Sequence, residues 1–333
     1  MDIDLLALEP HKVSRDLRGY SVFFYGEPKS GKTTIASKFP NSLLLAFEKG
    51  YNALAGVMAQ PINSWAEFLK VCKQLKDEKV KAKFETIIID TADIAYSYCE
   101  KYICKANGAN TIADIPYGKG YALTGNEFDE KLRDIVQMGY GIVLISHATD
   151  KTFKDESGQE YNKIVPTLDK RANNIVARMA DIIGYSRAVT DENGNNKTIL
   201  FMRGTQRYEA GSRFKYTPDY IEFSHDNLVN AIADAIDKQA EEDGSELYTD
   251  TRENAYIDTS SHLDFDELMA EFGNIIKEFS EDEEKMETYY APRITQIINK
   301  LLGTGKRVND MTRDQVEQLA LIVDELKDIP KPV

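Results

Sequence analysis

The sequence predicts an α/β domain with a mostly parallel central sheet, followed by a small helical module. In the first 220 residues, short and nearly continuous apolar runs alternate with helical patterns, as expected for strands that are covered on both faces. Late in this region, a turn rich in Gly and Asn at 191–196 separates two β-like runs and predicts a hairpin. The expected strands occupy residues 21–25, 42–47, 86–90, 141–146, 180–189 and 197–203.

The module is indicated by three helical patterns in residues 264–280, 283–303 and 312–329. A polar, acidic and aperiodic stretch precedes them and is typical of a linker. We therefore expect a large α/β domain at 1–240, an acidic linker at 241–262 and an acidic helical module at 263–333.

Charge is unevenly distributed along the chain. The formal net charge is −14, and about −13 of it falls on residues 241–333. The first domain is therefore close to neutral. The low overall pI does not exclude a nucleic-acid site there, but such a site has to be a local one.

Two features of the sequence indicate the cellular compartment. No run of about twenty apolar residues predicts a membrane span, and the acidic N-terminus does not resemble a secretory signal. The three cysteines, Cys72, Cys99 and Cys104, show neither disulfide pairing nor metal-ligand spacing. We expect buried free thiols in a reducing, intracellular setting.

A phosphate-binding loop follows the first strand. Gly26, Gly31, Lys32 and Thr33 match the pattern G-x-x-x-x-G-K-[ST], and a helical pattern comes next. This order surrounds phosphates with backbone N–H groups and a helix N-terminus, with Lys32 on the β- and γ-phosphates. The alternative is a glycine turn with a surface lysine. The predicted ATP-binding residues are Gly26, Glu27, Pro28, Lys29, Ser30, Gly31, Lys32, Thr33 and Thr34.

A magnesium site is predicted from two of the strand ends. The Thr33 hydroxyl is a candidate Mg²⁺ ligand, and Asp90 ends the apolar run 86–90 at the edge of the sheet that faces the phosphates. Asp90 has an alternative role as the cap of the following helix.

Hydrolysis also requires an acceptor that orients or deprotonates water. The residue after Asp90 is Thr91, so an acid often found there is absent. Glu48, after the strand 42–47, is the predicted base, with an exposed loop glutamate as the alternative. Asp93 is the second candidate, or else an exposed acid in the first turn of a helix.

His147 follows the strand 141–146 and is a candidate γ-phosphate sensor. It could equally be a strand-end histidine that bonds to the backbone.

These parts occur in the same order in the RecA-like ATPase core. More narrowly, residues 23–54, 86–102, 117–121 and 142–151 resemble the phage-encoded nucleotide-binding ATPases. Some members of that group act as RecA-like recombinases or single-strand annealing proteins. The resemblance covers roughly residues 10–240. It implies a RecA-like P-loop NTPase core and an ATP- and Mg²⁺-dependent protein that binds single-stranded DNA, in the cytoplasm of an infected bacterial host.

The resemblance also implies a homo-oligomer or filament, with ATP sites between subunits and a basic residue supplied in trans. Arg213 and Lys215 are the first candidates, followed by Arg203 and Arg207. A solvated basic face is the alternative for all four.

Two flexible loops carry DNA in RecA-like proteins, and they correspond here to 106–121 and 148–163. Lysine binds phosphate and an aromatic ring stacks under a base in single-strand recognition. The candidate DNA-binding residues are Tyr117, Lys119, Lys151, Phe153 and Lys154. Either loop could instead be an active-site lid. The acidic residues in 148–163 make DNA binding by that loop less favourable.

The function of the acidic module is left open by the sequence. It could be a solvated helical bundle, restrain access of DNA, or dock a partner such as a single-strand-binding protein. Two other functions also remain open: a replication-associated ATPase that loads or remodels a protein partner, and a nucleotide-gated binding module with little turnover.

Overall fold

The computed structural model describes residues 6, 10–251 and 263–332. The chain divides into two compact units, one within Pro10–Ile257 and one formed mainly by Asp258–Val333. Residue 240, where the sequence analysis ended the first domain, lies inside helix α7 (His225–Asp243), so the first unit continues beyond it. Of the expected linker, 252–262 lie outside the described residues.

The first unit is built on one large sheet with the strand order β11-β9-β8-β2-β6-β5-β3-β4. The strands from β8 to β4 all run parallel, whereas β9 and β11 are antiparallel to their neighbours. The predicted late hairpin is formed by β8 and β9 and is confirmed. The bounds are β2 (Ser21–Gly26), β3 (Ser42–Ala46), β4 (Ala59–Pro61), β5 (Thr86–Asp90), β6 (Gly141–Lys154), β8 (Ile182–Thr190), β9 (Asn196–Phe201) and β11 (Tyr220–Glu222).

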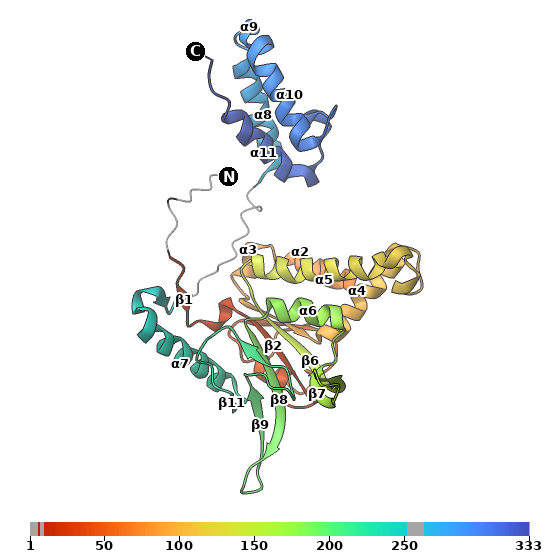
Figure 1. Ribbon diagram of the computed structural model, residues 1–333, viewed down its shortest axis with the longest axis vertical. Helices are drawn as coiled ribbons and strands as arrows, with labels where there is room; N and C mark the ends of the chain where they lie inside the picture. Colours follow the sequence, from red (N-terminus) through yellow and green to blue (C-terminus); the bar gives the residue numbers. More distant parts are fainter. Residues whose placement is uncertain (1–5, 7–9, 252–262, 333) are drawn as a thin grey trace. The chain divides into compact units, whose positions relative to one another are not determined.

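Both faces of the sheet are covered, which explains why its central strands are apolar throughout. In β2, Phe23 and Tyr25 pack into one buried cluster, while Val22 and Phe24 pack into the other. The first cluster lies under α2 (Trp65–Gln74), α4 (Ala92–Ala106), α5 (Lys119–Gln137) and α6 (Lys170–Met179), which Figure 1 shows on the same side of the sheet. The second lies under α1 (Lys32–Ala36) and α7.

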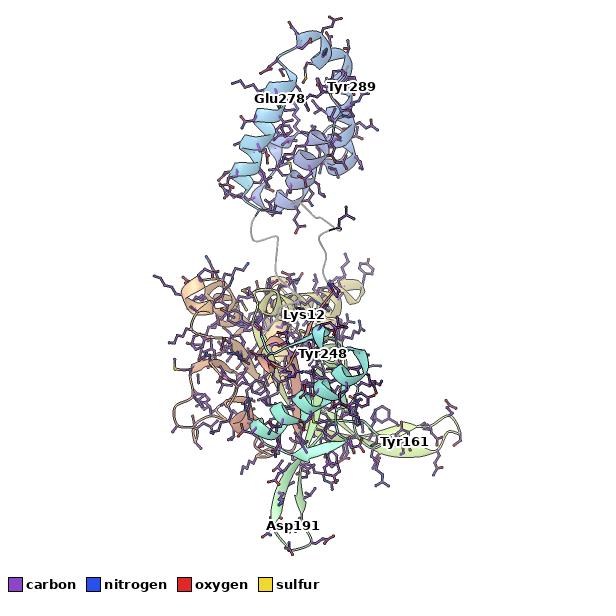
Figure 2. The ribbon with its side chains drawn as sticks, turned by 90° about the vertical axis from the view of Figure 1, so that its left-hand side faces the viewer. Lys12, Tyr161, Asp191, Tyr248, Glu278 and Tyr289 are labelled. Atoms are coloured by element: carbon purple, nitrogen blue, oxygen red, sulfur yellow. The ribbon has the colours of Figure 1, made fainter. Side chains whose placement is uncertain are left out.

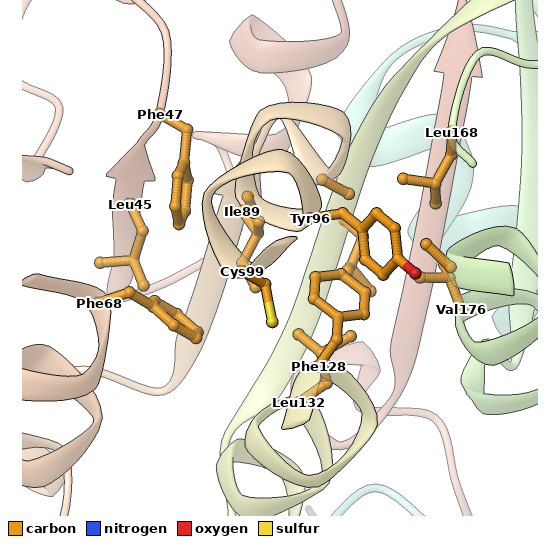
Figure 3. Packing of buried hydrophobic residues seen from close by; sticks show 14 of the residues in the cluster. Leu45, Phe47, Phe68, Ile89, Tyr96, Cys99, Phe128, Leu132, Leu168 and Val176 are labelled. Atoms are coloured by element: carbon orange, nitrogen blue, oxygen red, sulfur yellow. The ribbon is translucent and has the colours of Figure 1, made fainter. Parts of the chain in front are cut away.

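Aromatic contacts fix α4 and α5 on this face. The rings of Tyr96 on α4 and Phe128 on α5 meet edge to face with centroids 5.2 Å apart (Figure 3). Cys99, one turn further along α4, is buried beside them. All three cysteines are buried and free, as the sequence predicted.

Smaller elements complete the first unit. Strand β1 pairs with β12, β10 pairs with β8, and the short helix α3 follows α2. Their bounds are β1 (Val13–Ser14), α3 (Glu78–Lys81), β10 (Gly211–Ser212) and β12 (Tyr248–Thr249).

The parallel register brings the ends of β2, β3 and β5 next to residues 145–147 within β6. Gly26 at the end of β2 is paired with His147 of β6, and Asp90 at the end of β5 is paired with Ala46 of β3 and Ile145 of β6. Side chains that follow these strands therefore share one edge of the sheet. The predicted α/β class with a mostly parallel sheet is confirmed.

The two expected flexible loops are folded differently from the prediction. Residues 148–163 were expected to be a loop, but β6 continues to Lys154 and pairs antiparallel with β7 (Glu160–Pro166). Thr152, Phe153 and Tyr161 are residue types that favour strands, and Gly158 supplies the positive φ of the connecting turn. Figure 2 shows this hairpin at Tyr161 and the β8–β9 hairpin at Asp191, both projecting from the body of the unit. Residues 106–121 contain two 3₁₀ turns, η3 (Ile112–Asp114) and η4 (Pro116–Gly118), and the start of α5.

The second unit is a small helical bundle, and the three predicted helical segments are confirmed. Its buried residues, which include Phe279, Tyr290 and Leu319, form a core of their own. The helices are α8 (Phe265–Phe279), α9 (Glu283–Lys285), the π-helical turn η7 (Met286–Tyr290), α10 (Ala291–Leu302) and α11 (Val316–Lys327).

Candidate nucleotide site

The phosphate loop connects β2 to α1 in a tightly constrained conformation. Gly31 caps α1 with φ 83°, and Lys29 also lies in the left-handed region with φ 65°. A Cβ on Gly26 would lie 2.2 Å from Oγ of Ser186 on the neighbouring strand β8, so only glycine fits there. Oγ of Ser186 lies 2.8 Å from Oγ of Ser30, and this contact links the loop to strand β8. The sequence analysis did not identify Ser186.

Lys32 is folded back into this loop. Its Nζ donates to the carbonyl oxygens of Gly26 at 3.0 Å and Glu27 at 2.7 Å, and to Oγ of Ser30 at 3.3 Å. The residue is only 5% exposed. Burial lowers the pKa of Lys32 to about 8, although nearby Asp90 acts in the opposite direction. The ammonium group is thus a desolvated cation that a phosphate would stabilise.

Thr33 and Asp90 face each other across the site. The Thr33 hydroxyl donates to Oδ2 of Asp90 at 2.7 Å, and Asp90 is 2% exposed. Burial raises the pKa of Asp90 to about 6, while the Thr33 hydrogen bond lowers it. A hydroxyl and a carboxylate oxygen at this spacing are the donor types that Mg²⁺ takes in proteins, so the pair fits the ion.

Glu48 is placed by the backbone of Asp90. The N–H groups of Phe47 and Glu48 donate to the Asp90 carbonyl oxygen at 2.8 and 3.2 Å, which holds the chain after β3 against the end of β5. Oε2 of Glu48 lies 3.6 Å from Nε2 of His147. This pairing lowers the pKa of Glu48 and raises the pKa of His147. Nδ1 of His147 is buried and has no hydrogen-bond partner among the described residues.

Gly50 is a further residue of the site that the sequence analysis missed. A Cβ placed on it would lie 3.4 Å from Oε1 of Glu48 and 3.7 Å from Oδ2 of Asp90. The only sequence signal is a glycine two residues after Glu48. Together these groups enclose a cleft of about 380 Å³. It is lined by Pro28, Lys29, Ser30, Gly31, Lys32, Thr33, Thr34, Glu48, Gly50, Asp90, Ile145 and His147.

Asp93, the second candidate base, is engaged elsewhere. Its Oδ1 accepts hydrogen bonds from Thr167 at 2.6 Å and from Ser146 at 3.1 Å. It does not line the cleft. The geometry therefore favours Glu48 over Asp93 as the acceptor for water.

The basic residues considered for action in trans do not line this chain's own cleft. Arg213 bonds to the Arg178 carbonyl oxygen and lies 3.4 Å from Asp181, whose backbone N–H donates to Ser21 at the start of β2. It therefore lies at the opposite end of β2 from Gly26. Lys215 pairs with Glu242 at 2.7 Å.

The two remaining basic candidates differ from each other. The Arg203 guanidinium donates to the carbonyl oxygens of Phe214 at 2.8 Å and Thr217 at 3.1 Å, so it holds its own loop in place. Arg207 is exposed, and no ion pair to its side chain is found in the described part of the chain.

The candidate DNA-binding residues lie on two separate projections. Tyr117 is 97% exposed on η4, and Lys119 begins α5, at the end of the α4–α5 helical pair. Lys151, Phe153 and Lys154 lie on the β6–β7 hairpin, where the Phe153 ring stacks on Tyr161 with centroids 5.9 Å apart. Lys154 lies 3.4 Å from Glu160, which partly neutralises it.

Comparisons with known proteins place this site in context. Residues 18–214 match the family model described as an AAA domain. The SPbeta prophage-derived uncharacterized protein YorG of Bacillus subtilis (strain 168) is 33% identical over 337 residues, with 99% of each chain covered.

Two solved structures have a similar arrangement at 13% identity. The KaiC-like protein PH0186 from Pyrococcus horikoshii OT3 has a TM-score of 0.35, with 65% of this chain and 100% of that chain covered. The flagellar accessory protein FlaH from Methanocaldococcus jannaschii has a TM-score of 0.31, with 65% and 95% covered. None of the helices in the described residues is long and apolar enough to cross a membrane.

Proposed function

This chain belongs to the AAA-domain family, and on that premise we propose that it binds ATP with Mg²⁺ in the cleft at the end of β2 and hydrolyses it. The observation that carries the proposal is the convergence of Lys32, Thr33, Asp90, Glu48 and His147 on that one cleft. A fold match alone would not assign an activity. A buried cation beside two carboxylates, at the N-terminus of a helix, provides the groups that phosphoryl transfer needs.

Each residue has a distinct role in the proposed reaction. The backbone N–H groups of the loop and the Lys32 ammonium bind the phosphates, in place of the carbonyl oxygens that Lys32 now contacts. Thr33 and Asp90 hold Mg²⁺, which neutralises charge on the phosphate oxygens when bound. Glu48 orients and deprotonates the attacking water, and His147 contacts the γ-phosphate.

We further propose that the ATPase is coupled to single-stranded DNA in recombination or annealing. Support comes from the exposed Tyr117 beside Lys119 and from the Phe153 ring with lysines on the β6–β7 hairpin. Such pairs of aromatic ring and lysine are the chemistry of single-strand binding. β6 continues directly from His147 into that hairpin, so a change at the γ-phosphate could be passed to it along one strand.

The active form in this proposal is a homo-oligomer or filament. In this arrangement a basic residue of one subunit, Arg213 or Lys215, completes the ATP site of the next subunit. Neither residue lines the nucleotide cleft of the chain that carries it. A single-strand-binding protein is the proposed additional partner of the acidic second unit.

A second candidate function is an ATPase that loads or remodels a protein partner. The separate core of the second unit favours it, because a bundle that folds on its own can serve as a docking module. A nucleotide-gated module with little turnover is the third candidate, and the pairing of Glu48 with His147 is the observation behind it.

One experiment separates these functions. ATP hydrolysis is measured with Mg²⁺, with and without single-stranded DNA, and Lys32→Ala serves as the inactive control. Stimulation by DNA that is lost in Lys32→Ala supports the first proposal. Turnover that DNA does not change supports the partner-remodelling function. Tight ATP binding without turnover supports the nucleotide-gated module.

A further inference from the structure

A cavity separate from the nucleotide cleft lies between α4, η3 and the start of α5. It has a volume of about 570 Å³, within the range of small-molecule pockets. Its wall combines Glu100, Lys101 and Lys105 of α4 with Asn110, Thr111 and Tyr121. Figure 1 shows α4 and α5 running side by side to the edge of the unit, and residues of both helices line the cavity.

Exposed aromatic and apolar side chains occur on the segments that form or adjoin this cavity. Tyr102 lies on α4, Tyr117 on η4, and Tyr121 and Leu123 on α5, and all four are exposed. Tyr121 lines the cavity and is 45% exposed, so its ring is accessible for stacking.

The charge around the cavity identifies the kind of ligand. Lys101, Lys105 and Lys119 form no ion pair with any carboxylate of the described residues. Asp114, the acid nearest in sequence to η4, accepts a hydrogen bond from the Thr111 backbone N–H at 2.8 Å. Three lysines without ion pairs beside exposed tyrosines are complementary to a phosphate backbone with bases attached.

Glu100 supplies a hydrogen-bond acceptor in the cavity wall. Its carboxylate is half-buried in the cavity wall and has neither a hydrogen bond nor an ion pair within the described part of the chain. Burial, with Asp169 nearby, raises the pKa of this carboxyl. The Glu100 carboxylate borders the cavity, so it is available to accept a hydrogen bond from a ligand that brings an N–H group.

We propose that this cavity receives one base of a single-stranded DNA and selects cytosine and adenine by their exocyclic amino groups. Glu100 accepts the hydrogen bond from the amino group of cytosine or adenine, Tyr121 stacks on the base, and the lysines contact the adjoining phosphates. Thymine presents a carbonyl oxygen at the corresponding position and is disfavoured. The inference rests on the proposed single-stranded DNA function and adds a base preference to it.

The test compares fluorescently labelled oligo-dC and oligo-dT of equal length, at one salt concentration and at a mildly alkaline pH that keeps Glu100 ionised. Oligo-dC is expected to bind on the order of tenfold more tightly, the factor that a hydrogen bond to a charged acceptor provides. Glu100→Gln is expected to abolish the preference, because an amide both donates and accepts. Its melting temperature reports whether the variant is folded.

A lysine variant and its control test the phosphate contacts. Lys105→Ala should weaken binding of both oligonucleotides equally and reduce the slope of log affinity against log salt by about 0.7. Lys79→Ala, an exposed lysine on α3 away from the cavity, should change neither. Equal affinity for both oligonucleotides, or a preference that survives Glu100→Gln, would overturn the base pocket and leave the DNA function standing. Binding of neither oligonucleotide would overturn both proposals and favour a protein ligand for the cavity.

Discussion

Nε2 of His147 and Oε2 of Glu48 lie 3.6 Å apart at the rim of the nucleotide cleft, and each residue favours the charged form of the other. The pair joins the segment that follows β3 to the middle of β6, two strands that are separated in the sheet by β5. A phosphate that attracts the protonated imidazole would weaken its hold on Glu48. The carboxylate would then be available to a water molecule only when the nucleotide is bound.

Glu48→Gln is expected to reduce the rate of ATP hydrolysis by about 10²–10⁴ and to leave ATP affinity nearly unchanged. The amide keeps the shape of the side chain but cannot accept the proton of the attacking water. Single-turnover hydrolysis and equilibrium binding measure the two effects separately. Asp93→Asn is the matched control, because Asp93 is bonded to Thr167 and does not line the cleft. A greater loss in Asp93→Asn than in Glu48→Gln would contradict the assignment.

His147→Asn should move the acidic limb of the kcat/KM profile to higher pH. Glu48 has to be ionised to act as the base, so activity is lost as the pH falls through its pKa. The interaction with His147 is the main cause that lowers this pKa, and without the imidazole it rises towards its ordinary value. The pH dependence of kcat/KM, which reports the nucleotide-free enzyme, measures the shift. An unchanged acidic limb would show that His147 does not act on Glu48.

The central part of the site could be predicted from the sequence because its signals are local. The phosphate loop is defined by glycines at fixed spacing between a strand and a helix, and Asp90 directly ends a strand. Glu48 and His147 are distant in sequence, but each follows a run of apolar residues that predicts a parallel strand. Parallel strands have their carboxyl ends at one edge of the sheet, so the two residues are expected there. A polar residue just after a predicted parallel strand can therefore be placed at this edge of the sheet from the sequence alone.

Other features depend on the conformation of distant segments and had no such signal. Ser186 braces Ser30 only because β8 lies beside β2 in a particular register. Asp93 accepts a hydrogen bond from Thr167, and its position in the first turn of α4 does not indicate this contact. Likewise, 148–163 was predicted to be a loop because it is polar and contains glycine, although its Thr and aromatic residues favour strands and it pairs as a hairpin.

ATP affinity is expected to fall as the pH rises above about 8. Burial lowers the pKa of Lys32 to about 8 in the nucleotide-free protein. Phosphates bind the ammonium form, so above this pH each binding event takes up a proton, and affinity falls by up to about tenfold per pH unit. Lys32→Arg remains protonated and should bind with no such dependence. Equal slopes for both proteins, measured by titration with ATP, would exclude Lys32 as the titrating group.

Asp90→Asn should weaken Mg²⁺-dependent ATP binding and remove one pH-dependent contribution to stability. Burial raises the pKa of Asp90 to about 6, above the usual 3.8, so the folded state favours the protonated acid. This contribution therefore increases stability as the pH falls from about 6 towards 4. In the variant, denaturant unfolding should lose this gain, and chelation of Mg²⁺ should change ATP affinity less than in the unaltered protein. Wild-type dependence in both measurements would contradict the role of Asp90.

The two units should unfold independently because their hydrophobic cores share no residue. Phe279 stacks on Tyr290 within the second unit, with centroids 4.1 Å apart, and Phe279→Ala should cost about 3 kcal/mol there. A bundle of this size has little stability to spare, so its thermal transition should fall sharply or disappear. The transition that ATP raises should remain in place. Phe128→Ala in the first unit is the matched control and should lower that transition instead. Scanning calorimetry of the full chain with and without Mg²⁺ and ATP distinguishes the two, and a single transition that both variants lower would show that the units fold as one.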